Sequence, residues 1–118
     1  MSIPRIRRFG TDVPAPEIGS PERVLKGTPV TTLHNYFEST DHKFFAGVWE
    51  STVGKWRVSY TEDEFCMLQA GKVILTADDG TSQTYIAGDS FVIPAGFSGT
   101  WETIEPVRKL YAIYQREP

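Results

Sequence analysis

The chain has 118 residues and a formal net charge of -3, with 40% hydrophobic and 23% charged residues. These values predict one globular domain and exclude a disordered chain. The charge gives no electrostatic reason to expect a nucleic-acid partner, and no apolar run approaches the roughly 18 residues of a membrane span. The single cysteine, Cys66, excludes an intramolecular disulfide and any cysteine-cluster metal site. Because the N-terminus lacks the apolar region of a signal peptide, we expect a cytoplasmic protein.

The first 26 residues differ in composition from the rest of the chain. They carry five basic and three acidic residues, a net charge of +2, which leaves -5 for the remaining 92 residues. They also contain four of the eight prolines. We expect residues 1–26 to form an extended arm, either solvated or lying across a partner, and residues 27–118 to form a single barrel.

From residue 30 onward the sequence is typical of short strands. Residues 56–60 alternate large apolar with polar side chains, which indicates a half-buried strand, and the Asp-Gly pair at 79–80 predicts a tight hairpin turn. No segment has the apolar spacing of a helix over three turns. The expected strands are 30–37, 44–49, 56–60, 64–69, 72–77, 84–87, 90–93, 99–103 and 107–115. This pattern predicts an all-β, antiparallel sandwich or barrel with little helix.

Two glycine-centred motifs narrow the fold. The first motif, residues 64–71, begins with Glu64 and ends with Gly71. The second, residues 88–96, fits Gly-x5-Pro-x-Gly. In this order, with the hairpin between them, they resemble the two motifs of the cupin superfamily. That resemblance implies an antiparallel jelly-roll β-barrel of the RmlC-like type.

A closer resemblance extends over roughly residues 44–115. The segments that carry it are 47–50, 56–60, 64–71, 96–103 and 106–111. They are similar to the small single-domain cupins grouped with (S)-ureidoglycine aminohydrolase and the ethanolamine-utilisation cupin. Many members of that group have no assigned activity, so the resemblance implies the fold more strongly than a reaction.

The sequence departs from the metal-binding cupins at their ligand positions. Those proteins carry two histidines, spaced His-x-His, before the glutamate and a third after the Pro-x-Gly glycine. The matching positions here are Val58 and Tyr60 for one spacing, Arg57 and Ser59 for the other, and Gly99 in the second motif. Only Glu64 is kept. Since a transition metal needs about three or four converging ligands, we predict no metal and no other cofactor.

The two histidines and the cysteine provide no clear alternative metal site or catalytic nucleophile. His42 falls in an expected turn and is most simply a surface residue. His34 lies in the first expected strand, where an exposed position, a place at the edge of the core and ligation all remain open. Cys66 has no identifiable base or cation to activate it, so we expect a buried structural thiol.

Alternation along the strands nevertheless outlines a pocket. Residues Trp56, Val58 and Tyr60 would point inward from one strand, Glu64 from the next, and Gly99, Trp101 and Thr103 from a strand across the cavity. On the last strand the inward face is either Val107, Lys109 and Tyr111 or Arg108, Leu110 and Ala112. We take Glu64, Tyr60 and Lys109 as candidate catalytic residues and Trp56, Trp101 and Tyr111 as candidate ligand-binding residues.

Two classes of function follow. The first is a metal-independent acid–base enzyme acting on a small amino or ureido compound, as the family resemblance suggests. The second is a non-catalytic module that binds a small molecule or a partner. A lone Glu64 among aromatic rings would favour a cationic or N–H-rich ligand, whereas an inward Lys109 would neutralise it and favour a neutral polar or acidic one. The apolar residues on both faces of 110–114 also predict a homodimer.

Overall fold

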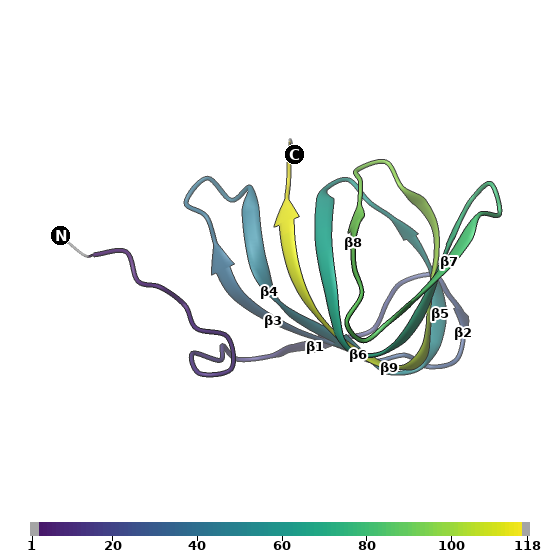
Figure 1. Cartoon of the computed structure of the whole chain (residues 1–118), viewed down its shortest axis with the longest axis horizontal. Helices are drawn as coiled ribbons and strands as arrows, with labels where there is room; N and C mark the ends of the chain where they lie inside the picture. Colours follow the sequence, from purple (N-terminus) through teal and green to yellow (C-terminus); the bar gives the residue numbers. More distant parts are fainter. Residues whose placement is uncertain (1–2, 117–118) are drawn as a thin grey trace.

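The computed structural model describes residues 3–116, and within them it contains nine strands and no helix (Figure 1). The strands are β1 (Glu17–Gly19), β2 (Val24–Lys26), β3 (Thr31–Glu38), β4 (Phe44–Ser51), β5 (Gly54–Ser59), β6 (Asp63–Ala77), β7 (Ser82–Ile86), β8 (Ser90–Ile93) and β9 (Ser98–Tyr114). The prediction of an all-β fold is confirmed.

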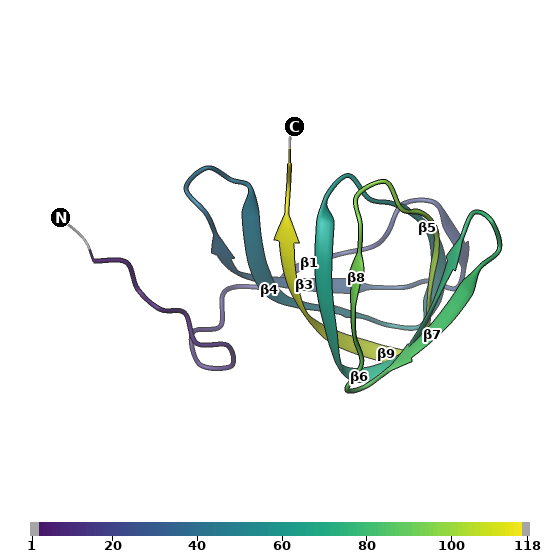
Figure 2. The same ribbon diagram turned by 45° about the horizontal axis from the view of Figure 1, so that its top comes forward.

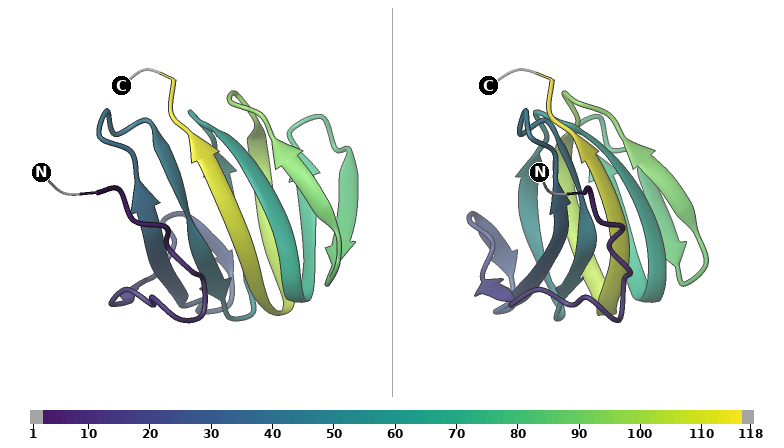
Figure 3. Two further views of the ribbon diagram at one scale, coloured as in Figure 1. Left: turned by 60° about the vertical axis from the view of Figure 1, so that its left-hand side comes forward. Right: turned by 90° about the vertical axis from the view of Figure 1, so that its left-hand side faces the viewer.

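Two long strands, β6 and β9, organise the fold. They pair with each other along both halves of their length. The C-terminal half of β9 also pairs with β4 and its N-terminal half with β5, while β8 and β7 pair with successive halves of β6. All pairings are antiparallel. The result is two curved sheets, β1-β3-β4-β9-β6-β8 and β2-β5-β9-β6-β7, which share their long strands and enclose the interior of a jelly roll (Figure 3).

Both long strands bend where they pass from one sheet to the other. The register between β6 and β9 shifts over the stretch from Leu68 to Val73, and Gly71 there has a φ of +91°. Because of this irregularity Leu68 is buried before the bend and Val73 after it, although they do not lie on the same face of a regular strand. The bend thus keeps apolar side chains inside both sheets.

The bend also explains a difference from the sequence-based expectation. Residues 64–69 and 72–77 belong to one strand, and so do residues 99–103 and 107–115 as far as Tyr114. Pro106 lies inside β9 at the point where the ladder is irregular and has no paired partner. Its missing N–H therefore removes no hydrogen bond from the sheet.

We expect Gly71→Ala to destabilise the protein strongly. The backbone conformation alone costs about 1–3 kcal/mol for a residue with a side chain. In addition, the new methyl group would collide with the backbone carbonyl of Pro106 in β9. Gly80 is a matched control, because its φ is also +91° but a methyl group there meets no atom within 4 Å. Urea denaturation should show a larger loss for Gly71→Ala than for Gly80→Ala; equal losses would contradict the role of the close approach.

The N-terminal segment is partly built into the sheets of its own chain. β1 pairs with β3 at the edge of the first sheet, and β2 pairs with β5 at the edge of the second. The stretch between them therefore crosses from one sheet to the other (Figure 2). Residues 17–26 of the expected arm belong structurally to the barrel, and the Arg7 guanidinium lies 5.3 Å from the ring centre of Phe37 in β3. The chain before Arg7 leads away from the barrel (Figure 1).

The buried apolar side chains gather in one part of the interior. They come mainly from β6 and β9, with contributions from β5 and β8, and include Leu68, Val73, Leu75, Ile93 and Val107. The rest of the interior, against β3, β4 and β5, is occupied by a cavity. Over residues 3–116 the structure has no helix of the length and apolarity that a membrane crossing requires.

Candidate functional site

A cavity of about 650 Å³ opens between the two sheets. Its walls are the inward faces of β3, β4, β5, β6 and β9, together with residues from the stretch between β1 and β2, such as Pro21 and Arg23. The strands deliver the pocket residues by alternation, since every second side chain of a strand points to the same face. This is a volume suited to a small-molecule ligand.

A buried ion pair lies in the cavity wall. The Lys109 Nζ is 2.7 Å from Glu64 Oε2, and both side chains are almost fully buried. Glu64 is delivered by β6, where it alternates with outward Phe65, and Lys109 by β9, where it alternates with Arg108. On the last strand the inward face is therefore that of Val107, Lys109 and Tyr111.

Aromatic rings surround the ammonium group of Lys109. Its Nζ lies 4.7 Å from the ring centre of Trp49 and 4.6 Å from that of Trp101. Trp56 completes the cluster, with ring centres 6.2 Å from Trp49 and 6.4 Å from Trp101. The faces of the rings attract the cation, and this attraction is strongest in a desolvated place.

The charged state of Lys109 depends on the groups that surround it. Burial opposes the charged form of Lys109, but the neighbouring Glu64, Cys66 and Tyr60 together outweigh burial and raise the pKa of Lys109 above that of an ordinary lysine. Lys109 is therefore an ammonium donor at neutral pH. Of the two alternatives that the sequence leaves open, the structure has the one in which Lys109 points inward and neutralises Glu64.

Two tyrosine hydroxyls of the wall keep their protons at neutral pH. Burial raises the pKa of the Tyr60 hydroxyl, and the opposing charge of Lys109 does not offset this effect. Burial also raises the pKa of Tyr111, whose hydroxyl donates a 2.6 Å hydrogen bond to Asn35 Oδ1. At the wall, burial and the nearby Glu64 raise the pKa of Glu62. The pocket thus offers hydroxyl and ammonium donors near one carboxylate.

Cys66 lies beside the pair. Its thiol donates to Glu64 Oε2 at 3.4 Å, and Lys109 Nζ donates to its sulfur at 3.7 Å. Burial, together with the Glu64 charge, raises the pKa of the Cys66 thiol to about 12. The expectation of a buried thiol is confirmed.

We expect Cys66 to be almost inert in the folded protein. A pKa of about 12 lowers the thiolate fraction at pH 8 by about a thousandfold relative to a free thiol, and burial adds a barrier to the reagent. Reaction with an aromatic disulfide reagent should therefore be slow in buffer and fast in denaturant. Comparable rates in the two conditions would contradict this placement.

The residues at the expected metal positions do not fit a transition metal. Val58 supplies no donor and Tyr60 keeps its proton, while a side chain at Gly99 would collide with the backbone carbonyl of Thr76. Among residues 3–116 no three histidine, cysteine or acidic side chains are close enough to hold a metal ion. The Glu64 carboxylate is neutralised by the ammonium of Lys109.

Neither histidine lies in the cavity wall. The Nδ1 of His34 is 3.2 Å from the carbonyl of Pro14, on the outer face of β3. The ring of His42 pairs with the exposed Glu38 carboxylate in the turn after β3. His34 therefore occupies an outer position at the edge of the arm.

All six candidate site residues, Glu64, Tyr60, Lys109, Trp56, Trp101 and Tyr111, lie in the cavity wall. Trp49 was not predicted as a pocket residue, although strand alternation places it on the same inward face of β4 as Phe45. Glu62 and Asn35 also lie in the wall and were not predicted. Sequence reasoning could not find the wall formed by residues 21–23, because that wall depends on the pairing of β1 and β2 with distant strands.

Solved structures with similar folds come from several bacteria. A protein described as ethanolamine utilization protein Q from Salmonella typhimurium LT2 has a TM-score of 0.65 and 24% identity, over 74% of this chain and 71% of that one. A protein of unknown function of the DUF861 family from Pseudomonas syringae has a TM-score of 0.72 and 28% identity, over 86% of this chain and 43% of that one.

A third structure, a DUF861 family protein from Thermotoga maritima, is 36% identical over 54% of this chain and 73% of that one, with a TM-score of 0.53. No curated protein matches the sequence. The EutQ-like cupin domain matches residues 38–111, which include β4 to β8 and most of β9. With this match over more than half of its length, the chain belongs to the family of EutQ-like cupin domains.

Proposed function

We propose that this cupin binds a compact, neutral polar molecule of the amide or ureido type in its cavity. The observation that carries the proposal is the Glu64–Lys109 pair, which presents an acceptor and a donor side by side at 2.7 Å in an aromatic wall. A ligand with adjacent N–H and C=O groups complements both: its N–H donates to the carboxylate and its carbonyl accepts from the ammonium.

The charges of the cavity wall favour a ligand that is neutral where it contacts the Glu64–Lys109 pair. A cationic amine at Glu64 would lie next to the Lys109 ammonium, which repels it. An anion is disfavoured by the wall as a whole, which contains five acidic side chains, Glu17, Glu22, Glu38, Glu62 and Glu64, and three basic ones, Arg23, Arg57 and Lys109. A carboxylate ligand therefore meets a net negative surface.

The protonation states favour binding over proton transfer. An efficient acid–base group has a pKa near the working pH. Burial raises the pKa of Tyr60, and Glu64 raises the pKa of Lys109, so neither readily exchanges a proton at neutral pH. The alternative, a metal-independent enzyme resembling ureidoglycine aminohydrolase with Glu64, Tyr60 and Lys109 as its catalytic residues, predicts turnover of a ureido compound.

The test is a titration of intrinsic tryptophan fluorescence, since three tryptophans line the cavity. The probes are N-methylurea, acetamide, propionate and ethanolamine, the last because of the name of the Salmonella relative. We expect the two neutral probes to bind more tightly than the charged ones. Product analysis of the N-methylurea mixture reports any turnover.

Substitutions that keep the shape of a side chain but remove its charge test whether the ligand binds at the Glu64–Lys109 pair. Glu64→Gln should weaken the binding of N-methylurea by about tenfold, because the charged acceptor is lost. The matched control is Asp63→Asn, in which the neighbouring carboxylate on the other face of β6 is changed; that variant should bind as the wild type does. Tighter binding of ethanolamine, or unchanged affinity in folded Glu64→Gln, would overturn the proposal.

A further inference from the structure

The cavity wall has an apolar part directly beside the ion pair. In the first sheet Phe45 of β4 pairs with Ile113 of β9, and Ile113 pairs with Glu64 of β6. Directly paired residues of a sheet point to the same side, so the two apolar side chains share the inward face with the carboxylate. Both line the cavity. A ligand held by Glu64 therefore has Ile113 and then Phe45 as its neighbours along the sheet.

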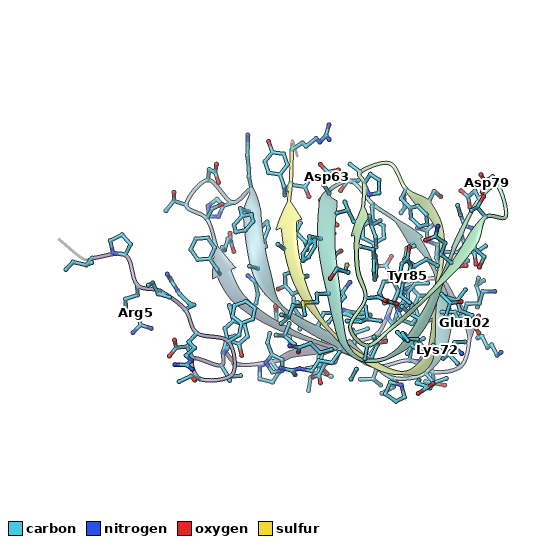
Figure 4. All side chains as sticks on the ribbon, in the orientation of Figure 1. Arg5, Asp63, Lys72, Asp79, Tyr85 and Glu102 are labelled. Atoms are coloured by element: carbon cyan, nitrogen blue, oxygen red, sulfur yellow. The ribbon has the colours of Figure 1, made fainter. Side chains whose placement is uncertain are left out.

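This row of three residues lies at the open end of the first sheet. Asp63 marks the start of β6 at the upper edge of the molecule in Figure 4, and Glu64 is the next residue. The Lys109 row, which includes Trp49, lies further along the strands. A group that extends from the ligand along Ile113 and Phe45 thus runs beside the edge of the barrel and does not displace the buried aromatic rings.

Phe45 and Ile113 offer apolar surface that folding leaves free. Among residues 3–116 the core cluster is made of side chains from β5, β6, β8 and β9, and it includes neither Phe45 nor Ile113. Both are only half-buried, and they face the cavity. Trp56 and Trp101, in contrast, are almost fully buried and have little free surface. The contact of an apolar group with Phe45 and Ile113 would remove more apolar surface from water.

The size of the cavity also indicates a ligand that extends beyond its amide group. A binding pocket usually encloses most of the surface of its ligand. The cavity has a volume of about 650 Å³, of which a molecule as small as N-methylurea fills a minor part. The distance along the row from Glu64 to Phe45 is about 10 Å, the width of two strand spacings. A butyl chain on the ligand would reach past Ile113 toward Phe45.

We propose that the ligand carries an alkyl or aryl group on its amide or ureido nitrogen, and that Phe45 and Ile113 form an apolar subsite for this group. The inference rests on the proposed function, because it takes the polar end of the ligand to lie at the Glu64–Lys109 pair. The nitrogen that donates to Glu64 then carries its substituent next to Ile113. Beyond Phe45 the row ends at the charged Glu38 of β3, which limits the length of the subsite.

The test compares N-butylurea with N-methylurea in the titration of tryptophan fluorescence. The two probes have the same polar group and differ only in apolar chain length. If the added methylene groups contact the subsite, N-butylurea should bind at least about tenfold more tightly to the wild type. The ratio of the two affinities measures the subsite separately from the polar contacts, which both probes share.

Substitutions at the subsite should lower this ratio. Phe45→Ala removes most of the apolar surface, so the ratio should fall close to one. Phe44→Ala is the matched control, because Phe44 is the next residue of β4 and points to the other face, where its ring centre lies 6.0 Å from that of Phe37. The ratio of Phe44→Ala should equal that of the wild type. Ile113→Thr keeps a β-branched side chain and should lower the ratio severalfold; it decides the test if Phe45→Ala does not fold.

The outcomes separate the subsite from the proposed function. An affinity for N-butylurea within about twofold of that for N-methylurea would overturn the subsite, and so would a wild-type ratio in folded Phe45→Ala or in folded Ile113→Thr. An equal fall of the ratio in Phe44→Ala would also overturn it, because the effect would then be structural. In these cases binding of N-methylurea still supports the proposed function. If neither urea binds, the proposed function is wrong and the subsite with it.

Discussion

Lys109→Met is expected to lower the free energy of unfolding by about 3–5 kcal/mol, because it leaves the Glu64 carboxylate buried without its partner. In the native protein the ammonium lies 2.7 Å from Glu64 Oε2 and against the faces of Trp49 and Trp101. Methionine has a similar length and keeps most of the apolar packing. The loss in free energy of unfolding is therefore the cost of leaving the Glu64 charge buried without a partner. Urea denaturation at neutral pH measures this loss.

The double variant Glu64→Leu/Lys109→Met is the control. It removes both charges, so no ion is left unpaired, and replacement of a buried pair by apolar side chains is often neutral or stabilising. We expect it to recover most of the stability lost in Lys109→Met. A single variant within about 1 kcal/mol of the wild type would contradict a buried, charged pair.

Trp101→Ala is expected to destabilise the protein by a similar amount, about 3–5 kcal/mol. Trp101 is almost fully buried at the centre of the aromatic cluster, 5.3 Å from Trp49 and 6.4 Å from Trp56 between ring centres. Its Nε1 donates a 2.9 Å hydrogen bond to Thr103 Oγ1. The substitution leaves a large void, which the rigid sheet cannot close. It also removes one hydrogen bond of the Thr103 hydroxyl, which keeps its 2.6 Å bond with the Ser51 hydroxyl.

Trp101→Phe separates the two contributions. It keeps a ring against Lys109 but removes the N–H donor to Thr103, so we expect a smaller loss than in Trp101→Ala. Thermal unfolding followed by circular dichroism gives the comparison. If Trp101→Ala were as stable as Trp101→Phe, Trp101 would not fill the centre of the interior.

Much of the site could be predicted from strand periodicity. Glu64 and Cys66 point inward because β6 alternates regularly before its bend, and the same holds for Trp56 on β5. The last strand could not be assigned in this way, since both of its faces mix apolar with cationic side chains. Its direction is determined by pairing: Lys109 lies opposite Trp49 of β4 and Leu68 of β6, both from inward faces.

The continuity of the long strands and the wall at residues 21–23 could not be predicted from local sequence. Gly71 is typical of a turn, and only the ladder between β6 and β9 shows that the chain continues through it. β1 and β2 have three residues each, too few to show a period, and both are exposed. They form because the edges of β3 and β5 offer unpaired backbone groups.

If the Glu64–Lys109 pair contacts the ligand, binding must change the proton–nitrogen NMR signal of the Lys109 ammonium. A buried, paired ammonium exchanges its protons slowly and gives a resonance that Lys109→Arg removes. We predict that this resonance is present in the wild type and shifts progressively as N-methylurea is added, but not with propionate. An ammonium signal that stays unchanged while N-methylurea saturates the tryptophan fluorescence would show that the ligand binds away from the Glu64–Lys109 pair.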